Sequence, residues 1–457
     1  MDYALPDGLE DRVLSPALVV DLGKVRRNLA VVLGLCGGNA NKWRPHLKTT
    51  KCSRVWLEVL RAGVRHFKVA TTREAELLLR LVDRLLSENE EGAMTIPMDD
   101  LVDPDPRFPV TSWPAVVDVL IAYPLVGPAL RRAGQLARAH PRVRLSVLVE
   151  CVEAAKDLPP RVGAFVDVNP GMDRTGIAHA AVVGNEGGTQ QVVDVVRAAG
   201  PSFRGVHYYE GHLSECCAAV GASDDDVAAA LAARDAKCTS AYDVLASIVA
   251  AINVTARAVV PEVITSGTPG FTHALNFDLK SAVDRELDRL RANGSVVPPQ
   301  LNPDVARVPW PEHRVSPGTV VFHDWRGERQ NPGLGLAPAA VLMARVVSIP
   351  SPGKVVTLDC GSKAIAAEAG DPAGYVLGRP EWTAMGCSEE HLPCAVDGGR
   401  GGGMPKRGDV VFVVPEHICP TVNLAEKAVL VDGGEFVGVV DIEGRAHEVM
   451  LEDDAFV

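Results

Sequence analysis

Short apolar runs alternate with helical patterns over the first two-thirds of the chain. ALVVDL at residues 17–22 is typical of a strand, and the residues after it carry apolar side chains at helical spacing. HFKVAT at 66–71, followed by TREAELLLRLVDRLL, repeats the pattern. Further strand-like runs lie at 117–123, 143–150, 163–169, 203–209 and 258–267. This alternation predicts an α/β fold, a (β/α)8 barrel of about 250 residues, with a doubly wound open sheet as the alternative.

The pattern changes after residue 300. Runs such as KVVTLDC, DVVFVVP and EFVGVVDIEG are short, rich in β-branched residues and separated by Gly, Pro and Asp, which predicts an antiparallel β domain. The stretch 291–313 contains five prolines and is expected to connect the two parts. Two turn-rich segments without sustained periodicity, 87–114 and 371–386, are expected to be surface insertions.

Charge and cysteine content exclude several classes of protein. The 457 residues include 46 Lys and Arg against 58 Asp and Glu, a net charge of -12, which argues against a nucleic-acid binder while leaving room for a local basic pocket. The ten cysteines lack the spacing of a disulfide framework, which indicates a reducing compartment. The N-terminus is acidic and no apolar run is long enough to span a bilayer, so we expect a cytoplasmic protein that does not bind membranes.

RPHLKTTK at 44–51 places four basic side chains before a predicted helix. At the carboxyl end of a first barrel strand, Lys48 could form a Schiff base with an aldehyde cofactor, provided that neighbouring positive charge and burial keep its amine deprotonated. Arg44, His46 and Lys51 would supply that charge. The alternative is an ordinary solvated basic turn.

Two other stretches could bind a phosphorylated ligand. In ITSGTPGFTH, the backbone N–H groups of Ser266, Gly267 and Thr268 could hold a phosphate, although a tight turn explains the residues equally well. In DVNPGMDRTGI, Arg174 could bind a carboxylate or a phenolate oxygen of a cofactor, or could form a loop salt bridge.

Aromatic and imidazole groups gather after another strand, in HYYEGHLSE. His207, Tyr208, Tyr209 and His212 are suggestive of a pocket for a planar ring, while core packing would explain either tyrosine.

VVFVVPEHICPTVNL ends a strand-like run with His417 and Cys419. In an extended segment, residues two apart point to the same face, so the imidazole and the thiolate could bind one divalent ion, for which zinc is favoured. The alternative is a buried cysteine beside a turn histidine.

Together these stretches resemble the family of D-serine dehydratases and D-threonine aldolases, alanine racemase-like enzymes that use pyridoxal phosphate. The resemblance extends over nearly the whole chain. Nine motifs occur in the family's order: RPHLKTTK, VATTREAE, DVNPGMDRTG, GVHYYEGH, ITSGTP, SPGTVVFHDW, LDCGSKAI, SEEH at 388–391 and VPEHICPTVNL.

The resemblance implies a cofactor-binding barrel at 25–295 and a β domain formed by 1–24 and 300–457, in a homodimer. By the same resemblance, Lys48 is the Schiff-base lysine beside His46, Arg174 and Tyr209 flank the cofactor ring, Ser266, Gly267 and Thr268 hold the phosphate, and His417 and Cys419 bind the metal.

The implied reaction is a lyase reaction on a D-3-hydroxy amino acid. We expect dehydration of D-serine to pyruvate and ammonia, because the His-x-Cys pair resembles zinc-containing dehydratases. Manganese or magnesium remains possible, and the alternative reaction is retro-aldol cleavage of D-threonine. Two positions depart from the family pattern: Thr50 stands where a histidine is common, and Glu215 stands where aldolases carry a histidine base. A racemase or a non-catalytic pyridoxal phosphate protein remains a further alternative.

Overall fold

The computed structural model describes residues 5–90, 117–178, 187–215, 217–219, 221–295, 310–396 and 405–449. Contacts between residues divide the chain into two compact units. The first unit consists of Met1–Gly34, Leu47–Ala62 and Gly318–His447, and the second consists of Leu35–His46, Gly63–Pro317 and Glu448–Val457. Most of the predicted insertion at 87–114 lies outside the described residues.

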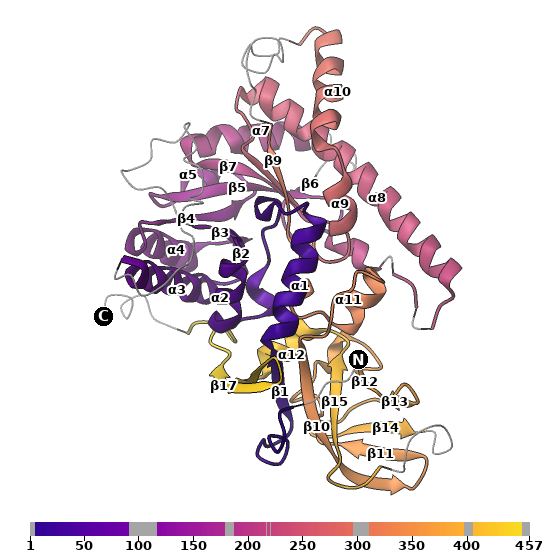
Figure 1. The fold of residues 1–457 in the computed structure, drawn as a ribbon. Helices are drawn as coiled ribbons and strands as arrows, with labels where there is room; N and C mark the ends of the chain where they lie inside the picture. The colour runs from indigo at the N-terminus through magenta and orange to yellow at the C-terminus, as the bar shows by residue number, and fades with distance from the viewer. Residues whose placement is uncertain are drawn as a thin grey trace. The chain divides into compact units, whose positions relative to one another are not determined.

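The second unit contains a parallel sheet with the strand order β2-β3-β4-β5-β7-β8-β9, and the short β6 pairs with β5 (Figure 1). Its strands are β2 (His66–Val69), β3 (Val117–Pro124), β4 (Val143–Val149), β5 (Val162–Asn169), β6 (Ile177–Ala178), β7 (Phe203–Tyr208), β8 (Glu262–Thr265) and β9 (Glu312–Val315). Leu120, Leu148, Phe165 and Ile264 form a buried cluster on four of these strands.

The segment between Trp43 and His46 joins the two edges of this sheet. Trp43 forms a parallel bridge with Val315 of β9, and His46 forms one with Lys68 of β2. With seven parallel strands and this eighth segment, the sheet closes on itself, which confirms the prediction of a (β/α)8 barrel.

Helices follow the strands of the barrel, as the alternating pattern predicted. They are α3 (Thr72–Glu90), α4 (Gly127–Ala139), α5 (Val152–Lys156), α7 (Gly188–Ala199), α8 (Asp224–Ala251), α9 (Phe271–Asn276) and α10 (Leu279–Ala292). Ser223 caps α8 by accepting a hydrogen bond from the Asp226 N–H, and three aspartates in the first turn suit the positive end of the helix dipole.

One helix of the described residues, Asp224–Ala256, has the length and composition needed to cross a membrane. Its mean hydropathy is 1.3 over the most apolar stretch, half of which is buried, and the helix packs against α10. Core helices of globular proteins meet the same criterion, so this feature is weak evidence for a membrane span.

The first unit is built on a mainly antiparallel sheet. Its strands are β1 (Ala17–Asp21), β10 (Ala340–Ser351), β11 (Val355–Leu358), β12 (Gly374–Val376), β13 (Trp382–Ala384), β14 (Leu392–Val396), β15 (Val410–Pro415), β16 (Lys427–Asp432) and β17 (Glu435–Asp441). Its helices are α1 (Leu22–Leu35), α2 (Ser53–Arg61), α11 (Trp325–Gln330) and α12 (Ile418–Leu424). β1 pairs antiparallel with β10 and parallel with β16, so the N-terminal strand belongs to this sheet and not to the barrel.

Three segments differ from the sequence expectations. The stretch 371–386 is not an insertion, because it contributes β12 and β13 to the sheet of the first unit. The stretch 291–313 contains the beginning of β9, so the barrel continues beyond residue 295 to Pro317. Leu47–Ala62 belongs to the first unit by its contacts, although 25–295 was expected to form one domain.

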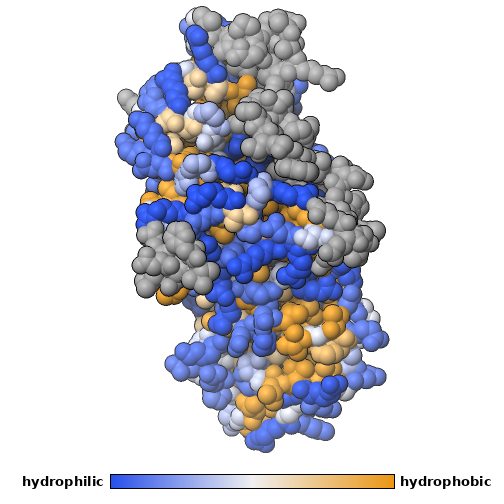
Figure 2. Space-filling model, turned by 90° about the vertical axis from the view of Figure 1, so that its left-hand side faces the viewer, coloured by the Kyte–Doolittle hydropathy of each residue, from blue (hydrophilic) through white to orange (hydrophobic). Residues whose placement is uncertain are grey.

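Hydrophobic residues also gather on the surface of the first unit (Figure 2). An apolar groove with a volume of about 580 Å³ is lined by residues of the N-terminal segment, β1, β16 and β17. Leu14, which lines it, is 92% exposed, and Val439 of β17 is 57% exposed. Exposed apolar side chains in such a groove are typical of a protein interaction surface.

Candidate functional site

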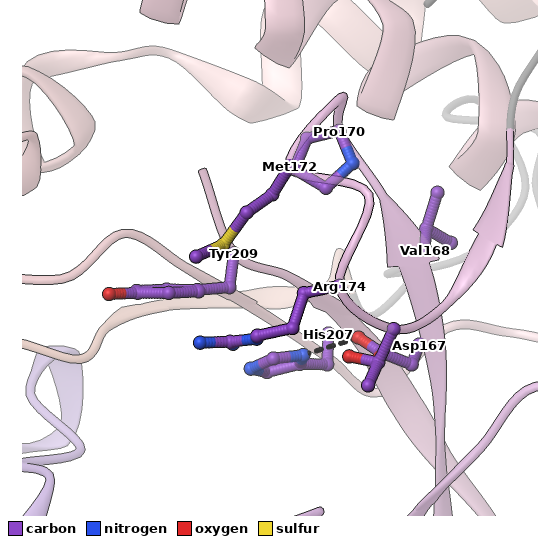
Figure 3. A pocket seen from close by; sticks show the side chains of 8 residues that line it. Asp167, Val168, Pro170, Met172, Arg174, His207 and Tyr209 are labelled. Atoms are coloured by element: carbon purple, nitrogen blue, oxygen red, sulfur yellow. Dashed lines mark hydrogen bonds and ion pairs between the residues drawn. The ribbon is translucent and has the colours of Figure 1, made fainter. Parts of the chain in front are cut away.

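The barrel residues proposed for cofactor binding follow three neighbouring strands. Arg174 follows β5, Tyr209 follows β7, and Ser266 begins the turn after β8. Carboxyl ends of parallel barrel strands meet at one face, where barrel enzymes bind their ligands. A small pocket between β5 and β7 is lined by Asp167, Arg174, His207, Tyr209 and four other residues (Figure 3).

The ring of Tyr209 is the planar surface of this pocket. The Arg174 guanidinium and the Lys68 ammonium each lie 5.0 Å from the ring centroid, and Figure 3 shows the Arg174 side chain extending along the ring. Two glycines make room for the ring. A side chain at Gly211 would overlap with the Tyr209 ring, and a Cβ at Gly267 would lie 2.9 Å from Tyr209 Cε2.

The turn after β8 has a shape that is set by a buried glutamate. Ser266 has a left-handed backbone, with φ of 54°, and its N–H donates to Glu210 Oε2 at 3.0 Å. Tyr242 donates its hydroxyl proton to the other oxygen of Glu210. Burial raises the pKa of Glu210 above its ordinary value. The hydrogen bonds from Tyr242 and Ser266 lower it, but they offset only part of the rise.

This geometry corrects one part of the phosphate hypothesis. The sequence analysis expected the Ser266 N–H to bind a phosphate, but this N–H donates to Glu210 instead. The Ser266 hydroxyl oxygen is buried and, among the described residues, has no hydrogen-bond partner. The hydroxyl group of Ser266, and not its N–H, is therefore the group of this residue that is left for a ligand.

Arg44 does not have the role that the sequence suggested. Its side chain is fully buried inside the barrel, where it donates to Glu262 and to Asp118, in both cases at 2.8 Å. The positive charge of Arg44 is thus neutralised by two carboxylates. The expectation that Arg44 tunes the Lys48 amine was wrong, because the side chain serves the barrel interior.

Lys48 lies in a short 3-10 helix, Leu47–Thr49, of the first unit. The segment around it is tied to its own unit. Thr50 is buried and accepts a hydrogen bond from Trp56 Nε1 at 2.7 Å, while Lys51 Nζ donates to the Gly444 carbonyl at 3.2 Å. Thr50, which replaces a common histidine of the family, therefore helps to fix the turn against α2.

His417 and Cys419 also lie in the first unit, and their side chains are hydrogen-bonded to each other. The expected geometry was wrong, since β15 ends at Pro415 and the two residues begin α12 instead of extending the strand. Cys419 comes within 3.1 Å of Thr49 Oγ1, and Asp324 Oδ2 lies 2.9 Å from His417 Nδ1. Asp324 thereby leaves the Nε2 atom of His417 for a metal.

His417 and Cys419 shift each other's pKa in opposite directions, and a metal bound here would displace the proton held between them. Burial lowers the pKa of His417, but the Cys419 thiolate and Asp324 outweigh burial and raise it to about 10. Burial raises the pKa of Cys419, but His417 and then Lys48 lower it to about 7. Within the described ranges, no group of three or more His, Cys, Asp and Glu side chains forms a fuller metal site. A metal here would have two protein ligands and positions left for other groups.

The sequence did not single out two of the residues at the site, Asp324 and Glu210, and the side chain of a third candidate lies outside the described part of the chain. Asp324 stands in the motif SPGTVVFHDW and has the signal of a helix N-cap, but it is separated from His417 by 93 residues and neither signal links the two. Glu210 was not distinguished from its neighbours in GVHYYEGH. Glu215 ends the short 3-10 helix Gly211–Glu215, and its side chain is not among the described ones.

The chain is similar to known lyases over almost its full length. A family model described as a putative serine dehydratase domain matches residues 339–431. D-threonine aldolase of Arthrobacter sp is 26% identical over 445 residues, which cover 95% of this chain and 93% of the relative. The solved D-threonine aldolase from Filomicrobium marinum aligns with a TM-score of 0.70 and 22% identity over 97% of this chain and 98% of its own.

A dehydratase has the same fold. D-threo-3-hydroxyaspartate dehydratase from Delftia sp. HT23 aligns with a TM-score of 0.60 and 18% identity over 96% of this chain and 98% of its own. Solved variants of D-threo-3-hydroxyaspartate dehydratase replace a histidine, or a cysteine two positions later, and the cysteine variant is described as metal-free. The barrel, the β unit and these similarities support the D-serine dehydratase and D-threonine aldolase family that the sequence motifs indicate.

Proposed function

We propose that this protein is a pyridoxal phosphate- and divalent metal-dependent lyase that dehydrates D-serine to pyruvate and ammonia. The observation that carries this proposal is the contact between His417 and Cys419, with Asp324 behind the imidazole. The same pair of residue types at the same spacing is replaced in the dehydratase variants. Zinc is the metal that an imidazole and a thiolate favour.

The barrel residues fit a phosphorylated ring. The hydroxyl of Ser266, which has no partner among the described residues, is available for a phosphate oxygen, with Thr268 two residues later. Arg174 carries a charge that suits a phenolate oxygen beside the Tyr209 ring. Lys48, two residues after His46, would be bonded to the cofactor, which when bound acts as an electron sink that makes the α-proton of an amino acid removable.

The reaction needs groups that move protons and a group that polarises the hydroxyl. The Lys48 amine would take the α-proton from the substrate. His417 Nε2 and Cys419 Sγ would hold the metal, whose Lewis acidity would assist departure of the 3-hydroxyl as water. Loss of water and subsequent hydrolysis convert D-serine to pyruvate and ammonia with no net redox change.

Retro-aldol cleavage is the second candidate, because D-threonine aldolases are similar to this chain in sequence and in fold. In that reaction a base removes the proton of the 3-hydroxyl, and glycine and an aldehyde are released. Glu215 would be the base, since it occupies the position at which aldolases carry a histidine.

Parallel product assays separate the two reactions. The protein would be incubated with D-serine, D-threonine and D-threo-3-hydroxyaspartate, and keto acid and glycine would be measured in each sample. We expect keto acid from D-serine, and loss of turnover with EDTA while the visible absorption of the bound cofactor stays. Glycine without keto acid from every substrate would refute dehydration, and absence of both products would refute the lyase function.

We also propose a homodimer, as the resemblance implies. The apolar groove around Leu14 and Val439 offers a surface for a second copy. Sedimentation at several concentrations tests this proposal, and replacement of Val439 with aspartate is expected to shift the protein toward the monomer. A monomer at all concentrations would contradict it.

A further inference from the structure

Asp167 and His207 form a buried pair inside the barrel. They lie opposite each other on the neighbouring parallel strands β5 and β7, and Asp167 Oδ1 lies 2.6 Å from His207 Nδ1. Both side chains are only 3% exposed. A carboxylate accepts hydrogen bonds and cannot donate them, so the ring proton of a neutral His207 lies on Nδ1.

The charges around His207 keep it neutral. Burial and the Lys68 ammonium lower the pKa of His207 to about 4, against the opposing effect of Asp167. Arg174 acts in the same direction as Lys68. With the proton on Nδ1, the Nε2 atom carries a lone pair and acts as a hydrogen-bond acceptor.

This acceptor has no partner in the described part of the chain. His207 Nε2 is buried and receives no hydrogen bond. His207 lines the same pocket as Arg174 and Tyr209, and Figure 3 shows its ring below the Arg174 side chain. A buried polar atom without a partner destabilises the folded protein, so a ligand that donates to it would gain binding energy.

We propose that His207 Nε2, oriented by Asp167, accepts a hydrogen bond from an N–H or O–H group of the bound ligand. This inference rests on the proposed function, under which the ligand has few such donors. Phosphate, carboxylate and phenolate oxygens are acceptors and cannot pair with a lone pair. The candidate donors that lie away from the amine are the protonated ring nitrogen of pyridoxal phosphate and the 3-hydroxyl of the amino acid.

Cofactor titration tests the first donor. Pyridoxal phosphate binding would be followed by its visible absorption in the wild type and in three variants, with circular dichroism as the control for folding. His207→Leu removes the acceptor, whereas His207→Gln keeps an amide oxygen in its place. If the ring nitrogen is the donor, we expect the Leu variant to bind about tenfold more weakly or worse, and the Gln variant to recover most of the affinity.

A cofactor analogue with carbon in place of the ring nitrogen sharpens this test. It has no N–H to donate, so the wild type and His207→Leu should bind it with equal affinity. Asp167→Asn provides a second test in which His207 remains. An asparagine amide can donate to Nδ1 and move the ring proton to Nε2, which would weaken cofactor binding in the same way.

Substrate binding tests the second donor. If the 3-hydroxyl is the donor, cofactor affinity stays unchanged in His207→Leu, the KM for D-serine rises, and inhibition by D-alanine, which has no hydroxyl, is unaffected. The proposal is overturned if folded His207→Leu and Asp167→Asn match the wild type for cofactor, D-serine and D-alanine. Failure of the wild type to bind the cofactor would instead overturn the proposed function, and with it this inference.

Discussion

Replacement of Arg44 with methionine tests whether this side chain supports the barrel or the cofactor. Arg44 is fully buried and donates to Glu262 and Asp118 at 2.8 Å each. Breaking a buried ion pair generally costs about 3–5 kcal/mol, because the remaining charge stays buried. Arg314 still lies 2.9 Å from Glu262 and Arg144 lies 3.5 Å from Asp118. We therefore expect the lower end of that range, a loss of about 3 kcal/mol in the free energy of unfolding.

The loss should depend on pH. Burial raises the pKa of Asp118, but Arg44 and Arg144 outweigh burial and hold the pKa well below its ordinary value. A carboxyl group with a lowered pKa in the folded state stabilises that state above its unfolded pKa of about 4, and this contribution is lost as the pH falls. The difference between Arg44→Met and the wild type should therefore be largest above about pH 4 and should shrink in acid.

Urea unfolding, followed by tryptophan fluorescence and circular dichroism at several pH values, measures both effects. Arg44→Lys is the matched control, because it keeps the charge but cannot bridge the two carboxylates with a planar guanidinium. We expect it to lie between the wild type and Arg44→Met. If Arg44→Met unfolds like the wild type and instead shifts the visible absorption of the bound cofactor, Arg44 belongs to the site and our structural assignment is wrong.

Three further variants test the site residues. Asp324→Asn should lower metal affinity about 10- to 100-fold, because the His417 ring loses its carboxylate partner. Competition with a chromophoric chelator would measure the loss, and unchanged affinity would show that Asp324 does not support the metal ligand. Gly211→Ala should abolish cofactor absorption at unchanged circular dichroism, since a Cβ would overlap with Tyr209, and normal cofactor binding would contradict the assigned ring position. Thr50→His should destabilise the fold by about 1–3 kcal/mol through overpacking without raising aldolase activity; a gain of glycine production would show that a relay was restored.

The barrel could be predicted from its best-buried strands, but not from all of them. β4, VRLSVLV, is an almost continuous apolar run, as expected for a parallel strand that is covered on both faces. β9, EHRV, has no such signature, because Arg314 points its charge to Glu262 inside the barrel. The closing segment carries Arg44 for the same reason. Strands whose interior partners are charged do not show an apolar pattern.

The site was predictable where its residues lie close together in the sequence. Lys48, Arg174 and Tyr209 each stand within a short motif, and motifs can be recognised without a structure. The contact of Asp324 with His417 joins residues 93 apart, and no spacing rule predicts it. The pair of His417 and Cys419 was recognised in the sequence, but the extended geometry expected for it was wrong. The chain changes from strand to helix between Pro415 and Ile418.

The distribution of hydrogen-bond partners within the barrel gives an independent argument for where the ligand binds. The Arg44 guanidinium donates to Asp118 and to Glu262, so its hydrogen bonds are made within the barrel. In the part of the chain that the structure describes, three buried atoms near the carboxyl ends of the neighbouring strands β5, β7 and β8 have no partner, namely Asp167 Oδ2, His207 Nε2 and Ser266 Oγ. Each such atom costs about 1–3 kcal/mol as long as it has no partner. A polar ligand bound at this end of the barrel, where barrel enzymes bind their substrates, would supply partners to all three and recover that cost.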